Sequence, residues 1–375
     1  MRAAAVGLAL PTGSTWENMR HAHSHVMFFS WVTPGLMAVI TQSMRRLGAS
    51  MPRVETIMVV AVLLGIASFF PFMMDGYGTS NVAGRQIPLS VIFSTLSMFT
   101  WYAFGWQFWR GANCLVGAAR PTLRIAVAAL ILSTIGAWLR GAFVGLHVTD
   151  RFTTDGAVHA FVTTFSLGWL LVGTLGVLHL HRHTPMSRTL RWANGAIAFG
   201  LAGTWIMSVA KMFVPPTLWT LGAWCSFVFG FGALTHVATL WQRGSSRLVL
   251  VPAALVSLAQ AYAGLPGVMS WADANKLRVP YLHALFLLVV SVTLIDQAQP
   301  WLGHSHTRNP QNLTHRFAAT SWLLVAGIFP TTMLWPSLLR SAFDPWVVAV
   351  TAVFPVVVGA SLVWRFWPRT GVVCR

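Results

Sequence analysis

The chain has 375 residues, of which 55% are hydrophobic and only 9% are charged, and its mean hydropathy is +0.64. These values exclude a soluble domain, in which about 25% of the residues are charged. The formal net charge is +17, but the positive side chains are spread over short gaps between apolar segments. They therefore indicate membrane orientation and contact with anionic lipid rather than nucleic-acid binding.

Apolar segments long enough to cross a bilayer recur along the chain. A transmembrane helix needs about 20 mostly apolar residues, and the sequence supplies them repeatedly between arginine-bearing gaps. We predict an all-α integral membrane protein that forms one polytopic domain over residues 1–375, with eleven spans. The predicted spans are 22–44, 54–75, 87–109, 122–146, 157–180, 190–213, 217–241, 248–265, 279–298, 317–338 and 345–366.

Positive charge is distributed unevenly between the two ends of these spans. Counted over alternate gaps, 16 of the 25 Lys and Arg residues fall on one side. The positive-inside rule makes that side cytoplasmic, so we expect the N-terminus outside and the C-terminus inside a bacterial-type inner (plasma) membrane. The three cysteines form no CxxC pair, which excludes a covalently attached c-type haem.

Three histidines begin apolar helices at near-equal intervals. His23, His159 and His283 are separated by 136 and 124 residues, and on the predicted topology all three lie near the outer face. Histidine inside a membrane is costly and usually binds something. The three-part spacing predicts that these helices occupy equivalent positions in a pseudo-threefold bundle. The alternative for each is an ordinary core or interfacial histidine.

Two further histidines, His21 and His25, flank the first of the three. Helical residues two apart point about 200° away from each other, so at most one or two of the three side chains can face one pocket. The simplest interpretation is a single ligand with two interfacial histidines. A copper site built from His21, His23 and His25 would need an extended chain before the helix begins.

The segment that starts at His23 resembles a helix of a known family. Residues 23–34 read His-Ser-His-Val-Met-Phe-Phe-Ser-Trp-Val-Thr-Pro, which is similar to the second helix of haem–copper oxidase subunit I, roughly His-Ala-x-Val-Met-x-Phe-Phe-x-Val-x-Pro. In that family this histidine binds the low-spin haem, and helices two, six and ten carry the haem and copper ligands. The resemblance implies that this chain lacks the first of twelve helices and that its first, fifth and ninth spans are these three.

The same resemblance assigns a partner to His23. The family's tenth helix carries His-x-His, whose first histidine binds the active-site haem and whose second binds the low-spin haem. Here Tyr281 and His283 stand at these positions. The resemblance therefore implies a low-spin haem b with His23 and His283 as its two axial ligands, an arrangement that transfers electrons and leaves no open position.

The oxygen-reducing centre of the family is not matched. His159 lacks the proline, glutamate and tyrosine that follow the sixth-helix histidine, and Lys211 and Met212 stand where a His-His pair is expected. We therefore expect respiratory electron transfer or nitric-oxide-related chemistry without oxygen reduction, with His159 a candidate ligand for copper or a second haem. The His-Ala openings at 159 and 283 are also similar to NnrS-type haem and copper membrane proteins, whose first helix usually carries an acidic residue that is absent here.

Two arginines are candidates for binding haem propionates near the outer face. Arg140 lies about two turns inside the outer end of the predicted span 122–146, where an unpaired guanidinium is expensive and a carboxylate would be a bidentate partner. Arg340 lies in the last outer loop, where the family places propionate-binding arginines. The alternative for Arg140 is that its side chain extends to the lipid headgroups.

Two other classes of function were weighed against haem binding, namely a transporter or channel and a structural subunit of a respiratory complex. All eight acidic residues lie at span ends or in loops, whereas ion-coupled transporters usually carry a carboxylate near the bilayer midplane. A structural role is compatible with haem binding. The expected partners are the lipid bilayer and other membrane or periplasmic redox subunits.

Overall fold

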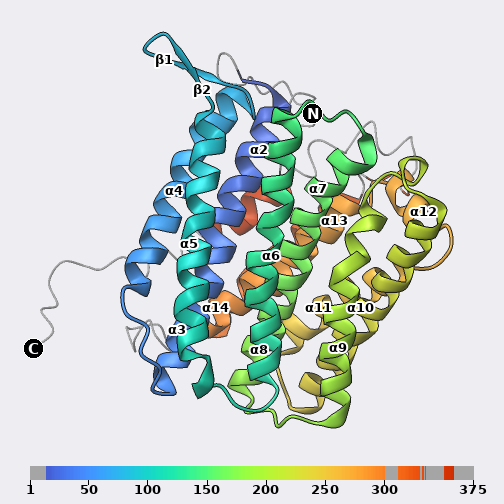
Figure 1. The fold of residues 1–375 in the computed structure, drawn as a ribbon. Helices are drawn as coiled ribbons and strands as arrows, with labels where there is room; N and C mark the ends of the chain where they lie inside the picture. Colours follow the sequence, from blue (N-terminus) through green and yellow to red (C-terminus); the bar gives the residue numbers. More distant parts are fainter. Residues whose placement is uncertain (1–13, 300–310, 330–331, 333, 335–349, 359–375) are drawn as a thin grey trace, which may run out of the picture.

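The computed structural model describes residues 14–299, 311–329, 332, 334 and 350–358, and these are almost entirely helical (Figure 1). The helices lie side by side in an elongated bundle, with one short hairpin at one end. In chain order the elements are α2 (Trp16–Val26), η1 (Met27–Val32), α3 (Thr33–Arg46), α4 (Val54–Asp75), β1 (Ser80–Val82), β2 (Arg85–Ile87), α5 (Leu89–Gly111), η2 (Ala112–Cys114), α6 (Ala119–Gly145), α7 (Arg151–Thr163), η3 (Thr164–Leu171), α8 (Val172–His181), α9 (Arg188–Gly203), η4 (Thr204–Ser208), η5 (Lys211–Phe213), α10 (Pro216–Gln242), α11 (Arg247–Ala263), α12 (Val268–Ala274), α13 (Arg278–His283), η6 (Ala284–Ser291), α14 (Val292–Ala298) and α15 (Gln311–Ile328).

Three long helices carry the three spaced histidines, and each is interrupted by a π-helical segment. These central helices are Trp16–Arg46 with η1, Arg151–His181 with η3, and Arg278–Ala298 with η6. Every π segment begins within five residues of the histidine that precedes it. Because π-helical turns are rare and occur frequently at functional sites, the three histidines mark three similar irregularities of the backbone.

The π segments of the central helices contact one another in the middle of the bundle. The ring of Phe28 lies 5.3 Å from that of Phe165 and 5.1 Å from that of Phe286, measured between centroids. Trp31 Nε1 donates a 2.9 Å hydrogen bond to Ser291 Oγ, which in turn donates to the Phe286 carbonyl at 2.8 Å. The Ser291 hydroxyl thus donates to a carbonyl of its own π segment, η6, and its bond from Trp31 joins η6 to η1.

A wedge of aromatic side chains fills the space between the first two central helices. Trp101 of α5 is fully buried, and its ring lies 5.2 Å from Phe29 of η1 and 5.2 Å from Phe165 of η3. Phe161 of α7 extends the stack at 6.5 Å from Trp101. Aromatic pairs of this kind contribute about 0.5–1.5 kcal/mol beyond the area they bury.

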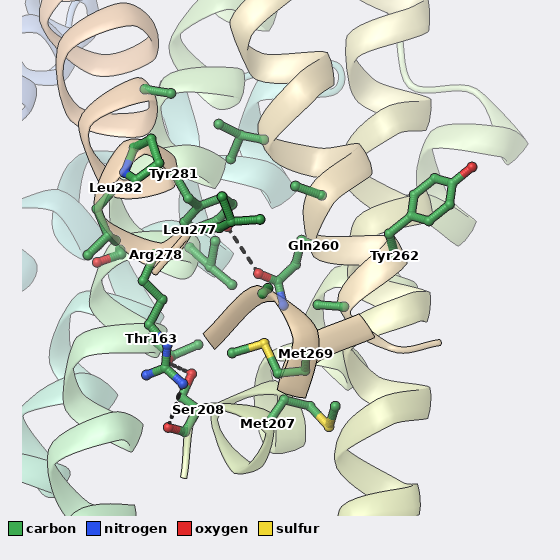
Figure 2. A pocket seen from close by; sticks show the side chains of 18 of the residues that line it. Thr163, Met207, Ser208, Gln260, Tyr262, Met269, Leu277, Arg278, Tyr281 and Leu282 are labelled. Atoms are coloured by element: carbon green, nitrogen blue, oxygen red, sulfur yellow. Dashed lines mark hydrogen bonds between the residues drawn. The ribbon is translucent and has the colours of Figure 1, made fainter. Parts of the chain in front are cut away.

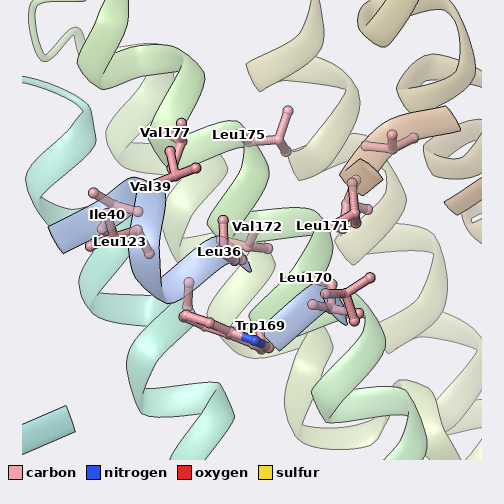
Figure 3. Close-up of a cluster of buried hydrophobic side chains, with 14 of the residues drawn as sticks. Leu36, Val39, Ile40, Leu123, Trp169, Leu170, Leu171, Val172, Leu175 and Val177 are labelled. Carbon is pink, nitrogen blue, oxygen red and sulfur yellow. The ribbon is translucent and has the colours of Figure 1, made fainter. Parts of the chain in front are cut away.

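Aliphatic side chains join the central helices further along the bundle. Figure 3 shows Leu36 and Ile40 of α3, Leu123 of α6, Trp169 of η3 and Val172 of α8 in one cluster, and all of them are fully buried. The remaining helices pack around this centre: α4 lies against α2 and α5, α6 against α7 and α8, and α10 against α9 and α11. The described residues form one large apolar core, and a second, small cluster of Ile206, Val209 and Val214 lies apart from it.

Fewer helices qualify as membrane spans than the eleven that we predicted. The described residues contain six that are long and apolar enough to cross a membrane, or seven if the bent pair Arg247–Ala263 and Val268–Ala274 is one span broken at 114°. The six are Trp16–Arg46, Val54–Asp75, Ala119–Gly145, Arg151–His181, Pro216–Gln242 and Arg278–Ala298. A multi-pass, all-α membrane protein is thus supported, and the count of eleven is wrong for this part of the chain.

The predicted spans that fail do so because of length or polarity. The segment 87–109 forms the 23-residue helix α5, but Ser, Thr, Gln and Trp side chains lower its hydropathy. The segment 190–213 forms the 16-residue helix α9 and then continues as the short turns η4 and η5. The segment 317–338 is helical only up to Ile328 in the part described, and most of 345–366 lies outside the described residues.

The three histidine-bearing helix starts lie at one end of the bundle. Figure 1 shows α2, α7 and α13 towards the end that carries the β1–β2 hairpin, and α3 and α8 at the opposite end. Chain connectivity brings the arginines of the helix junctions to that opposite end. They are Arg45, Arg46, Arg53, Arg110, Arg120, Arg124, Arg182, Arg188, Arg191, Arg243 and Arg247.

A pair of histidines is buried near the arginine-rich end. His179 of α8 and His236 of α10 are both 0% exposed, and His179 Nε2 lies 2.8 Å from His236 Nδ1. The other ring nitrogen of each has no partner among the described residues. Each imidazole therefore depends on the other for its one hydrogen bond in an apolar surrounding.

We expect the effects of replacing the two histidines of this pair on stability to be less than additive. His179→Leu or His236→Leu leaves the partner's buried nitrogens unsatisfied and should lower the free energy of unfolding by about 1–3 kcal/mol. The double variant should lie closer to the wild type than the sum of the single losses. Denaturant unfolding of the detergent-solubilised protein measures this, with His179→Leu plus Ser68→Ala as a distant, additive control pair. Additivity of the two histidine changes would contradict the interaction.

Candidate functional site

His23 and His283 lie on two different central helices, close enough for their rings to interact electrostatically. His23 lies on an exposed part of α2, and its ring interacts electrostatically with that of His283 at the end of α13. His283 Nδ1 lies 2.8 Å from the Val279 carbonyl. A carbonyl oxygen only accepts, so Nδ1 carries the proton and Nε2 keeps its lone pair. The backbone thus sets the tautomer of His283, as it commonly does for imidazoles that ligate a metal.

This pair suits a bis-histidine haem better than a multi-ligand metal ion. Two imidazoles from different helices, each with a lone pair available, are the donor set of a six-coordinate haem iron. In the part of the chain that the structure describes, no group of three or more His, Cys, Asp or Glu side chains could hold a metal ion. The chemistry of the donors therefore fits a haem at His23 and His283.

His21 and His25 lie on another side of α2 and share Tyr77 as a neighbour. His25 is stacked on Phe72 at 3.8 Å, its Nε2 lies 3.1 Å from Tyr77 Oη, and its Nδ1 lies 3.4 Å from Ser94 Oγ. The ring of His21 meets that of Tyr77 edge-on at 5.0 Å. These contacts engage both rings away from His283, so only His23 of the three is directed towards it.

Tyr77 lies in the turn after α4, outside the membrane-spanning helices. Burial raises the pKa of its hydroxyl, and the positive charge of Arg140 opposes this shift. The hydroxyl is within hydrogen-bond distance of His25 Nε2. Arg140 is exposed and lies near the C-terminal end of α6. Arg340 lies outside the described residues.

His159 lies in a different place, in the wall of a cavity of about 680 Å³. The cavity is bounded by α7 and η3, by α11 and α12, and by α13 and α15 (Figure 2). Tyr281 of α13 also lines it, and its hydroxyl donates to Gln260 Oε1 at 3.0 Å. Gln260 Nε2 donates onward to Thr204 Oγ1 and Ser226 Oγ. Tyr281 is thus tied to α11.

Arg278 is a cavity residue that sequence reasoning missed. Its guanidinium forms an ion pair with Asp273, with Nε 2.8 Å from Oδ1, and donates to the Ser208 carbonyl at 2.9 Å. Figure 2 shows it extending towards Ser208 beside Thr163. It also interacts electrostatically with His159. The sequence feature that could have revealed Arg278 is its place in the first turn of an apolar helix, five residues after the acidic Asp273.

Comparison with known proteins adds no identity to these observations. No protein-family model matches the sequence, and no curated protein matches it either.

The proximity of His23 and His283 can be tested by chemical cross-linking. In a variant whose native cysteines are replaced by alanine, His23→Cys with His283→Cys should be joined by a short bis-maleimide. His21→Cys with His283→Cys should not, because residues 21 and 23 point away from each other on α2. The chain is then cleaved at a protease site inserted in the loop between α8 and α9. Cross-linked protein should still run as a full-length band on a denaturing gel, whereas uncross-linked protein should separate into two fragments. Equal cross-linking of both pairs would refute the arrangement.

Proposed function

We propose that this chain is a haem-b-binding membrane protein that resembles haem–copper oxidase subunit I and lacks its oxygen-reducing centre. The observation that carries the proposal is the hydrogen bond that fixes His283 in the tautomer with Nε2 free, on a helix whose imidazole interacts electrostatically with that of His23. His23 and His283 would hold the haem through their imidazole nitrogens, and Arg140 would be the partner for a propionate. A haem bound in this way supplies one-electron transfer without an open coordination position.

The arrangement of the central helices supports the same proposal. Three helices with histidines near their starts and π segments behind them meet around Phe28, as expected of a pseudo-threefold bundle. At the position of the family's active-site haem ligand, the hydroxyl of Tyr281 is hydrogen-bonded to Gln260. The role that follows is electron transfer in a respiratory assembly, or chemistry related to nitric oxide, together with other membrane or periplasmic redox subunits.

The chain's own residues contribute binding and orientation. The helical carbonyl of Val279 orients the His283 ring, and the neighbouring contact between Trp31 and Ser291 ties α13's continuation η6 to η1. These contacts preset the separation of the two helices that carry the ligands. Copper is left out of the proposal because the described residues offer no group of three ligands.

The acidic residues weigh against an ion-coupled transporter as the second candidate. Glu17 and Glu55 lie in the first turns of α2 and α4, and Asp75 ends α4. Asp150 caps α7 and Asp296 lies near the end of α14. These carboxylates of the described residues therefore lie near helix ends. Ion-coupled transporters place their coupling sites near the bilayer midplane instead.

Spectroscopy of the purified protein tests the haem. Protein supplied with haem b should show a six-coordinate, low-spin spectrum and bind carbon monoxide slowly. His23→Ala or His283→Ala should open one position or lose the haem, whereas His21→Ala should keep the low-spin spectrum because that side chain points elsewhere. An unchanged low-spin spectrum in both His23→Ala and His283→Ala would falsify the assignment.

Orientation in the membrane follows from the arginine-rich end and is tested separately. We expect the loop between α8 and α9, which carries Arg182, to be cytoplasmic. A reporter that is active only in the cytoplasm should work when inserted there and fail when inserted in the β1–β2 hairpin. The reverse result would show that the histidines lie at the inner face.

A further inference from the structure

The cavity beside His159 opens towards the lipid-facing surface of the bundle. Its rim includes side chains that are strongly exposed, namely Leu255 at 51%, Tyr262 at 53% and Trp271 at 51%. Most of its lining is aliphatic or aromatic. In a membrane protein such an opening admits molecules that are dissolved in the bilayer, and its apolar wall favours a largely apolar occupant.

One wall of the cavity carries a line of polar side chains. His159, Thr163 and Ser166 are spaced by four and three residues and all line the cavity, as expected for one side of a helix. Ser166 is only 2% exposed, and its hydroxyl has no hydrogen-bond partner among the described residues. A buried hydroxyl without a partner is destabilising, so its presence points to a ligand that supplies an acceptor.

His159 provides a second unused group on the same wall. Its ring makes no hydrogen bond among the described residues. It interacts electrostatically with Arg278, Asp155 and Asp273. Seven residues separate it from Ser166, which is about 10 Å along a helix. A six-membered ring with two opposed oxygens can accept or donate one hydrogen bond of about 2.8 Å at each end. The ring and its two hydrogen bonds together span a distance of the same order as the separation of His159 and Ser166.

The charge balance favours a neutral ligand. Among the described residues that line the cavity, Arg278 is the one arginine or lysine, and it is already paired with Asp273 and bonded to the Ser208 carbonyl. An anionic headgroup would have to displace this ion pair. An acyl chain alone would leave the Ser166 hydroxyl without a partner. Met207, Met269 and Trp322 supply polarisable and aromatic surface for a flat ring.

We propose that this cavity binds a lipid-soluble para-quinone or its quinol, with Ser166 and His159 bonded to its two opposed oxygens. The proposal is independent of haem binding. Tyr281 borders this cavity, whereas His283, two residues further on, is directed to His23 on another side of the same helix.

Binding is measured on the full-length protein in nanodiscs, with decylubiquinone as the probe and calorimetric titration as the readout. The wild type should bind one quinone per chain saturably. Ser166→Ala should fold at least as well as the wild type, because it removes an unsatisfied hydroxyl, and should weaken binding about tenfold for the loss of one hydrogen bond. Ala259→Trp, which fills the cavity from α11, should abolish binding.

The matched control is Ser257→Ala on the same helix as Ala259. Ser257 is buried and does not line the cavity, and its hydroxyl already donates to the Ala253 carbonyl at 2.7 Å. It should bind decylubiquinone as the wild type does. Saturable binding that survives Ala259→Trp, a Ser166→Ala variant with wild-type affinity, or displacement of the quinone by palmitate at equal concentration would each overturn the proposal.

Discussion

The contact between three π-helical segments around Phe28 constrains the rest of the bundle. Each segment widens one turn of a central helix, and the widened turns meet where Phe28 packs between Phe165 and Phe286. A π turn interrupts the regular i→i−4 hydrogen-bond pattern. At this turn the Ser291 hydroxyl donates a hydrogen bond to the Phe286 carbonyl and accepts one from Trp31 Nε1. Because the helices are held at this point, the histidines that precede the segments are brought to one end of the bundle.

The three spaces between the central helices are used differently. Between the first and second, the rings of Phe29, Trp101 and Phe165 fill the space completely. Between the second and third lies the cavity lined by His159. The third and first central helices carry His283 and His23, whose rings interact electrostatically. The three spaces between similar helices are thus filled by aromatic rings, occupied by a cavity, or lined by two histidines. The side chains account for this difference.

The sequence allowed the central helices and their histidines to be predicted, because apolar length and periodic histidines are local properties of the chain. The helix Val54–Asp75 has the predicted bounds. The number of spans was overestimated because segments such as 190–213 are apolar on average, yet Thr204–Ser208 and Lys211–Phe213 turn away from the helix. The His179–His236 pair and the unpartnered Ser166 hydroxyl could not be predicted, since both depend on which helices become neighbours in space.

The helix α13 and the π segment after it separate two chemically distinct surroundings. On one side the hydroxyl of Tyr281 is bound to Gln260, whose amide continues to Thr204 and Ser226, so this position links α13 to α11 and η4. On the other side the Val279 carbonyl holds only Nδ1 of His283 and leaves Nε2 available. A tyrosine held in such a network is satisfied without a ligand, whereas the imidazole is satisfied only in part. The free donor nitrogen on this helix therefore belongs to His283, whereas the Tyr281 side chain is used in contacts between helices.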